Sequence, residues 1–174
     1  LAISAGALKI ESQGDALKST NENEGKGLVR IDGGTVALIS GDAGVKAENL
    51  VCVNGGDITI DAVDDALHSN GSLHVAGGSI SISAGDDGMH ADDALQIDGG
   101  SIDVSQSYEG IEGHAIYMSG GAVRVVSSDD GLNAANSDAE SADFPSASND
   151  AGDGRSFGGR DAHGGALGGG AGNE

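Results

Sequence analysis

The sequence predicts a right-handed parallel β-helix, a solenoid in which every coil contributes three short strands. The first observation is a repeat. Gly-Gly pairs recur every 21 or 22 residues, at Gly33-Gly34, Gly55-Gly56, Gly77-Gly78, Gly99-Gly100 and Gly120-Gly121. The second is that the same three apolar stretches return in the same order within each interval. The third is that no window of 11 or more residues has the 3.6-residue period of an amphipathic helix. A fixed period of this length built from strand-like stretches is typical of a solenoid.

The first two stretches alternate apolar and polar residues, as strands with one buried face do. The pairs of the first stretch are Val29/Ile31, Val51/Val53, Leu73/Val75, Leu95/Ile97 and Ile116/Met118. Those of the second are Leu8/Ile10, Val36/Leu38, Ile58/Ile60, Ile80/Ile82, Ile102/Val104 and Val123/Val125. The third stretch has one aliphatic residue per coil, namely Leu17, Val45, Leu67, Met89, Ile111 and Leu132.

These stretches predict about six coils of about 22 residues over residues 1–136. A degenerate first copy begins at Ala5-Gly6, and its extra length lies in the polar run Thr20–Gly27, which we expect to be a surface loop. A sandwich of β-hairpins is the alternative fold, but it would not require the same inward positions at a near-constant spacing. Residues 137–174 lose the pattern and predict a Gly/Asp/Ser-rich flexible tail or loop. Because residue 1 is a leucine inside a coil, we expect a piece of a larger protein.

The charge of the chain excludes some classes of partner. There are 28 Asp and Glu residues against eight Lys and Arg residues, which gives a formal net charge of −20. Nucleic acids and anionic membrane surfaces attract proteins of the opposite sign. No run of 18 apolar residues is present, so the sequence predicts no membrane span.

The acidic residues are not scattered, because each third stretch is closely preceded by a carboxylate. If the coils stack in register, these carboxylates form a column with a spacing of about 4.8 Å. Like charges at such distances repel, and calcium, which prefers oxygen ligands at about 2.3–2.6 Å, could lie between them. Magnesium is a second choice. The candidate metal ligands are Asp42, Asp64, Asp65, Asp86, Asp87, Glu109, Glu112, Asp129 and Asp130. The alternative is ordinary turn chemistry, in which an Asp before Gly or Ala accepts backbone N–H bonds at the corner.

The residue directly after each third-stretch aliphatic varies from coil to coil, as an outward-facing ligand surface would. His68 and His90 occupy this position where other coils have Lys18, Lys46, Glu112 and Asn133. Candidate ligand-binding residues are Lys46, His68, His90, Tyr108 and Asn133. The two imidazoles have no obvious third nitrogen partner, so the sequence does not predict a zinc site.

Three runs of the sequence carry a family resemblance. They are Gly85-Asp86-Asp87-Gly88-Met89-His90-Ala91-Asp92, Ser107-Tyr108-Glu109-Gly110-Ile111-Glu112-Gly113 and Ser128-Asp129-Asp130-Gly131-Leu132-Asn133-Ala134-Ala135. Their succession resembles the carbohydrate-binding β-helix family of clostridial extracellular proteins, which is similar in fold to pectate lyases. The resemblance covers about residues 28–136. It implies binding of calcium and of polygalacturonate or cellulose-like polymers, without an established catalytic activity. Gly41-Asp42 lacks the doubled acid of the pattern, and the first coil is degenerate, which puts metal binding there in doubt.

The function expected from the sequence is non-catalytic, calcium-dependent binding of an acidic plant-type polysaccharide such as polygalacturonate, outside the cell or at its surface. A polysaccharide lyase is one alternative. It would need a base beside the metal, and only Lys18 and Lys46 follow the acidic column. A structural or adhesin segment that calcium merely stabilises is the other.

Overall fold

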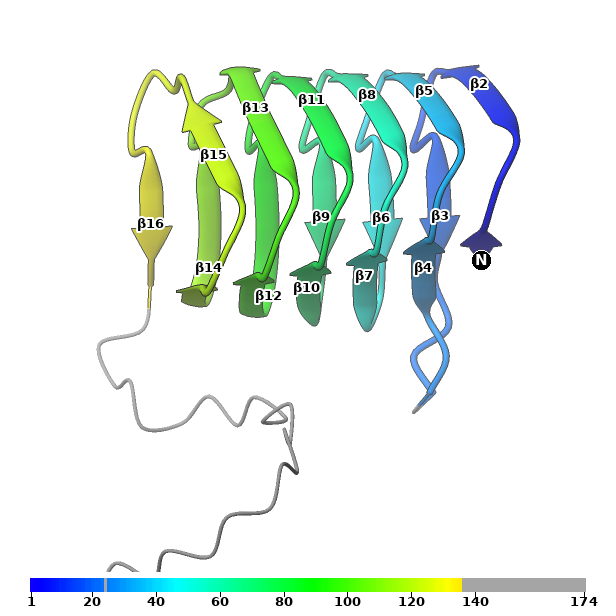
Figure 1. The fold of residues 1–174 in the computed structure, drawn as a ribbon, viewed down its shortest axis with the longest axis horizontal. Helices are drawn as coiled ribbons and strands as arrows, with labels where there is room; N and C mark the ends of the chain where they lie inside the picture. Colours follow the sequence, from blue (N-terminus) through cyan, green and yellow to red (C-terminus); the bar gives the residue numbers. More distant parts are fainter. Residues whose placement is uncertain (24, 136–174) are drawn as a thin grey trace, which may run out of the picture. The chain divides into compact units, whose positions relative to one another are not determined.

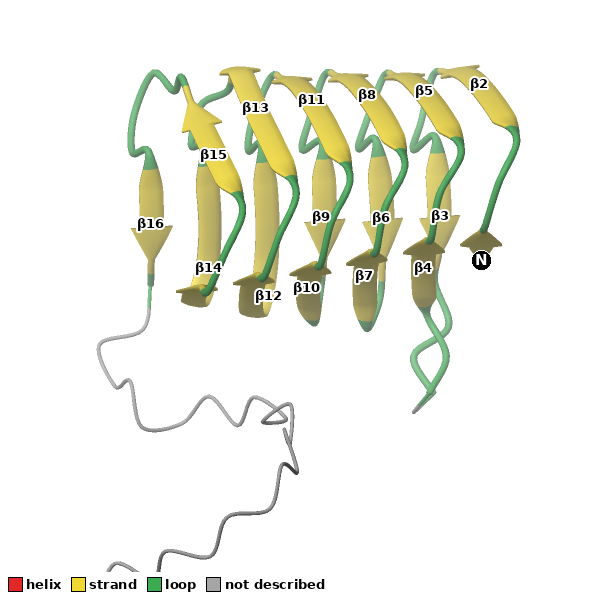
Figure 2. Ribbon diagram, viewed as in Figure 1, coloured by secondary structure: helices red, strands yellow, loops and turns green. Residues whose placement is uncertain are grey.

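The structure is a computed structural model that describes residues 1–23 and 25–135. All regular secondary structure in these residues is β-strand (Figure 2). Every pairing between strands is parallel, so the predicted parallel β-solenoid is confirmed. The described residues contain no helix with the length and apolar character needed to cross a membrane. The tail predicted for residues 137–174 lies outside the described part of the chain.

Three strand positions alternate along the chain and stack from coil to coil (Figure 1). The first position holds β1 (Ala2–Ile3), β4 (Leu28–Ile31), β7 (Leu50–Val53) and β10 (Ser72–Val75). The second holds β2 (Ala7–Ser12), β5 (Thr35–Ser40), β8 (Asp57–Ala62), β11 (Ser79–Ala84), β13 (Ser101–Gln106) and β15 (Ala122–Val125). The third holds β3 (Leu17–Ser19), β6 (Val45–Ala47), β9 (Leu67–Ser69) and β16 (Leu132–Ala134).

Two longer strands join the third position of one coil to the first position of the next. They are β12 (Met89–Ile97) and β14 (Ile111–Met118), and they differ from the three separate strands per coil that the sequence predicts. In earlier coils the chain turns between these positions at Glu48-Asn49 and at Asn70-Gly71, residue types that favour turns. In β12 the corresponding residues are Asp92-Asp93, and the chain stays extended, with a register irregularity between Ala91 and Ala94.

The core is a set of aliphatic rows that run along the solenoid. The third-position residues pair directly, Leu17 with Val45, Val45 with Leu67, Leu67 with Met89 and Met89 with Ile111. All are buried. The strands of the second position alternate buried and exposed residues, as in β8 and β11. The period-2 pattern of the sequence therefore predicts correctly which side chains of the central coils point inward. At the end of the described coils the prediction differs from the structure, because Met118 and Leu132 are 52% and 59% exposed.

The polar run of the first coil is irregular, as predicted, and a side chain of the second coil holds it. The Nδ2 atom of Asn49 lies 3.2 Å from the carbonyl oxygen of Asn21, 3.3 Å from that of Asn23 and 2.8 Å from that of Lys26. The loop therefore leaves the stacking of the coils undisturbed, because β3 pairs with β6 in the same register that later coils use.

Candidate functional site

Three parallel rows of polar residues lie at the corner before the third strand position and on that strand. We call the first the leading row. It contains Asp42, Asp64, Asp86, Tyr108 and Asp129. The trailing row follows it by one residue and contains Asp15, Asp65, Asp87, Glu109 and Asp130. The outer row lies on the strands and contains Lys18, Lys46, His68, His90, Glu112 and Asn133.

The register of the backbone brings these rows together. The amide of Tyr108 donates to the carbonyl of Asp86 at 2.7 Å, and the amide of Asp129 donates to that of Tyr108 at 2.9 Å. Outer-row residues are direct partners in the pairs Lys46–His68, His68–His90 and His90–Glu112. Every residue that the sequence analysis selects therefore lies in one of three adjacent rows on one side of the solenoid.

The buried trailing acids form hydrogen bonds within the protein. Asp65 is 6% exposed, and its Oδ1 atom accepts the backbone N–H of Asp87 at 2.9 Å. Asp15 accepts the N–H of Ala43 in the same way at 3.3 Å and forms an ion pair with Lys18. This is the corner chemistry that the sequence analysis weighs against calcium. At Asp65 one carboxylate oxygen is used to join two coils.

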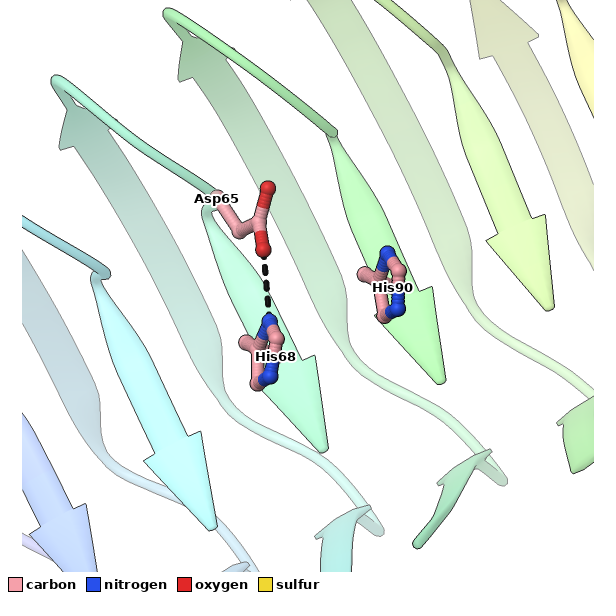
Figure 3. A group of neighbouring side chains, drawn as sticks. All are labelled: Asp65, His68 and His90. Carbon is pink, nitrogen blue, oxygen red and sulfur yellow. Dashed lines mark hydrogen bonds and ion pairs between the residues drawn. The ribbon is translucent and has the colours of Figure 1, made fainter. Parts of the chain in front are cut away.

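The second oxygen of Asp65 binds a histidine of the outer row. Its Oδ2 atom lies 2.6 Å from Nδ1 of His68 (Figure 3). Nε2 of His68 lies 2.8 Å from Oδ1 of Asn70. The hydrogen bond with Asp65 raises the pKa of His68 against the opposing effect of burial. Burial alone would raise the pKa of Asp65, but the hydrogen bonds from His68 and from the Asp87 amide outweigh it and lower that pKa.

The next coil repeats this arrangement around His90. Its Nδ1 atom lies 2.9 Å from Oδ2 of Asp87 and 3.1 Å from Oε2 of Glu112, while its Nε2 atom lies 3.1 Å from Oδ1 of Asp92. The hydrogen bond with Asp87 is the main cause that raises the pKa of His90 to about 9. The rings of His68 and His90 are stacked, with centroids 4.9 Å apart and planes 9° from parallel (Figure 3).

Further along the rows, amide and carboxylate side chains replace the histidines. Nδ2 of Asn133 donates to Oε2 of Glu109 at 3.1 Å and lies 3.4 Å from Oε1 of Glu112. Burial and a hydrogen bond with Asp87 raise the pKa of Glu112. The side chains of Asp129 and Asp130 are exposed. A hydrogen bond with Asp129 raises the pKa of the Tyr108 hydroxyl.

The leading acids are more accessible than the trailing acids. Asp64 is half-buried and Asp86 is exposed. Burial, then the neighbouring charge of Asp65 and a hydrogen bond with Asp42, raise the pKa of Asp64. Burial and the charge of Asp87 raise the pKa of Asp86. One oxygen from each of Asp64, Asp65 and Asp86 lies within 4.8 Å of the others. Hard oxygen donors at this separation fit around a calcium ion, whose ligands lie at about 2.3–2.6 Å.

A small open pocket of about 220 Å³ adjoins the outer row near the end of the described coils. Its walls include His90, Asp92, Glu112 and His114. Neither Asp92 nor His114 is predicted as a site residue from the sequence. Asp92 stands two residues after His90, and residues at this spacing share a side of an extended strand. A prediction that β12 continues through Asp92 would therefore have identified Asp92 as a neighbour of His90.

The histidine contacts predict how stability depends on pH in the presence of a chelator. His90 has a folded-state pKa of about 9 against an ordinary value of 6.5. The stabilisation of the folded state by protonated His90 is therefore fully present below pH 6.5, and it is lost as pH rises through about 9. Allowing for solvent screening of this half-buried group, we expect the free energy of unfolding to fall by on the order of 1 kcal/mol across that window. Urea denaturation at a series of pH values measures this change.

Two variants separate this effect from the general charge of the protein. His90→Gln should make the profile less steep, because it removes one of the two rings whose pKa is raised by a hydrogen bond to a buried aspartate. His114→Gln should leave the profile as it is, since His114 is exposed and has no hydrogen bond or ion pair with another described residue. A profile that is equally steep in His90→Gln would contradict the assignment.

Comparison with known proteins adds one finding to this geometry. A family model described as "Carbohydrate-binding domain-containing protein" matches residues 1–110 and, in a second match, residues 70–152. Together the two matches span all of the described coils. No curated protein and no solved structure matches the chain significantly.

Proposed function

The chain belongs to the family of carbohydrate-binding domain-containing proteins, and from this membership we propose that it binds an acidic, polygalacturonate-like polysaccharide in a calcium-dependent manner. The binding surface is the side of the solenoid that carries the three rows. Calcium ions held by leading acids, chiefly Asp64 and Asp86 with Asp42 beside them, would join these carboxylates to carboxylates of the glycan. The outer row would contact the same chain through Lys46, His68, His90 and Asn133, with Tyr108 of the leading row beside them.

The observation that carries this proposal is the convergence of the accessible Asp64 and Asp86 with the buried Asp65, because an oxygen of each lies within 4.8 Å of the others. Asp65 would be the weakest ligand of the three, because its oxygens already accept hydrogen bonds from the Asp87 amide and the His68 ring. The leading acids have no such backbone partners, so a hard cation there would relieve the repulsion between neighbouring carboxylates.

The net charge of −20 explains why a cation is needed. A polyanionic glycan approaching this surface is repelled unless divalent ions neutralise both partners. We also place the protein outside the cell or at its surface. Calcium-binding modules there have dissociation constants of about 10⁻⁴–10⁻³ M, which suits a site made of a few exposed carboxylates.

Affinity electrophoresis in gels containing polygalacturonate tests the proposal. We expect the protein to be retarded with calcium and released by EDTA. The double variant Asp64→Asn/Asp86→Asn should bind about tenfold more weakly in calcium, because it removes two of the converging oxygens. The matched control is Asp57→Asn/Asp61→Asn. It makes the same change in charge at two exposed residues of β8, away from the rows, and should bind like the unmodified protein.

Retardation that EDTA leaves unchanged would contradict the calcium dependence. A melting temperature that calcium raises, together with no retention by polygalacturonate, would favour the structural or adhesin role instead. Equal weakening in both double variants would show that only the overall charge matters.

A further inference from the structure

We propose that Asp87, His90 and Glu112 form a second type of metal site, which selects zinc or a similar first-row divalent cation rather than calcium. The site combines one imidazole nitrogen with two carboxylate oxygens. Calcium prefers ligand sets made entirely of oxygen, whereas zinc binds imidazole and carboxylate together. This inference does not depend on the proposed glycan or on calcium binding by the leading row.

The two distances from His90 to the carboxylate oxygens are close to those between the ligands of a tetrahedral ion. Zinc binds nitrogen and oxygen ligands at about 2.0–2.2 Å, so two ligands of one tetrahedral ion lie about 3.3 Å apart. Nδ1 of His90 is 2.9 Å from Oδ2 of Asp87 and 3.1 Å from Oε2 of Glu112, and each of the three residues offers one donor atom within 4.8 Å of the others. A small outward shift of the two carboxylates makes room for the ion.

The other side of the His90 ring supports the same conclusion. Histidines that bind a metal through one nitrogen usually donate the second N–H to a carboxylate, which fixes the ring and its tautomer. Nε2 of His90 lies 3.1 Å from Oδ1 of Asp92. Nδ1 therefore points at Asp87 and Glu112 while Asp92 holds the opposite edge. Asp92 is a positioning residue here, since it acts on the metal through His90.

An open pocket of about 220 Å³ adjoins the site, and His90 and Glu112 are among the residues that line it. A tetrahedral ion with three protein ligands keeps a fourth position open for water or for an oxygen of a ligand. The sequence does not predict this site because it offers no third nitrogen, and the structure supplies two carboxylates in its place.

The neighbouring group of Asp65, His68 and His90 is a weaker candidate for the same ion. Asp65 contributes one carboxylate whose other oxygen accepts the Asp87 amide. The imidazole rings of His68 and His90 are stacked, with their centroids 4.9 Å apart. Substitutions of His68 and Glu112 distinguish the two groups, because each belongs to only one of them.

The test uses the full chain, freed of metal with EDTA and returned to metal-free buffer at pH 7.5. Cobalt(II) is added first, because a tetrahedral cobalt site absorbs visible light and reports its own geometry. Zinc(II) is then titrated by calorimetry. We expect a saturable site that yields tetrahedral cobalt absorption and that tenfold excess calcium does not displace. His90→Gln and Glu112→Gln should each weaken zinc binding about tenfold or more, and Asp92→Asn should weaken it about tenfold.

His74→Gln is the matched control. Nε2 of His74 contacts a carboxylate too, Asp98 at 2.9 Å, but on a different strand, so this variant should bind zinc like the unmodified protein. Circular dichroism in EDTA identifies any variant that fails to fold. The variants that do fold then test whether zinc binds at Asp87, His90 and Glu112. The proposal is overturned if no saturable cobalt or zinc site appears, or if His74→Gln weakens binding as much as His90→Gln. It is also overturned if His68→Gln abolishes binding while Glu112→Gln does not.

Discussion

Replacing Leu67 with alanine is expected to lower the free energy of unfolding by about 2–5 kcal/mol. Leu67 is fully buried and is the third-position residue of the central coil, paired with Val45 on one side and Met89 on the other. Its truncation therefore removes contacts to two neighbouring coils and leaves a cavity in the row. Urea denaturation followed by circular dichroism measures the loss.

Val63→Ala is the control for Leu67→Ala. Val63 lies four residues earlier in the same coil but is 69% exposed, so its truncation should change the free energy of unfolding by less than about 0.5 kcal/mol. Similar losses in the two variants would contradict the burial pattern on which the fold assignment depends.

Gly78→Ala is expected to cost about 2 kcal/mol, for a reason that lies in the backbone. Gly78 has a φ angle of +102°, which L-residues adopt only with strain. A Cβ atom on Gly78 would also lie 3.0 Å from the carbonyl oxygen of Gly56, the equivalent glycine of the preceding coil. Because the corner glycines stack, the added methyl group would press on the neighbouring coil. Urea denaturation again gives the magnitude.

Gly14→Ala provides the comparison for Gly78→Ala. Gly14 does not have a φ angle in the left-handed region, and no atom lies within 4 Å of a Cβ built on it. Its substitution should be neutral or slightly stabilising, because alanine reduces the entropy of the unfolded chain. A neutral Gly78→Ala variant would contradict the close stacking of the corners.

Most of the fold can be predicted from the sequence, because each copy of the repeat forms one coil of the solenoid. The alternation of Ile80 and Ile82, or of Val51 and Val53, identifies the inward face locally, and the spacing of the glycines sets the register between coils. In this architecture the period of the repeat is therefore enough to predict which strands pair between coils. The merged strands β12 and β14 are the exception. Whether the chain turns or continues depends on a few residues, such as Asp92-Asp93 against Asn70-Gly71, for which the repeat gives no rule.

The candidate site is predictable as a surface but not as a set of contacts. The sequence places Asp64, Asp65 and His68 on one edge, and the register confirms that neighbouring coils repeat this arrangement. It does not show that Asp65 bonds an amide of the next coil, while Asp64 stays accessible. Which of the two acids is buried depends on the direction of each Cα–Cβ bond at the corner. The sequence does not reveal this direction, because both positions are aspartate. The assignment of Glu112 to the His90 group likewise depends on a contact between coils.

Most successive coils pair in the same register, so each of these coils is an interchangeable division of the solenoid. Removing residues 50–71, one division of 22 residues, would join Asn49 to Ser72 and still leave each retained strand a partner of the same type. Duplication of a division would lengthen the polar surface by one step without redesigning the core. Variation in coil number is therefore a simple evolutionary route by which such a protein could match the length of the chain that it binds.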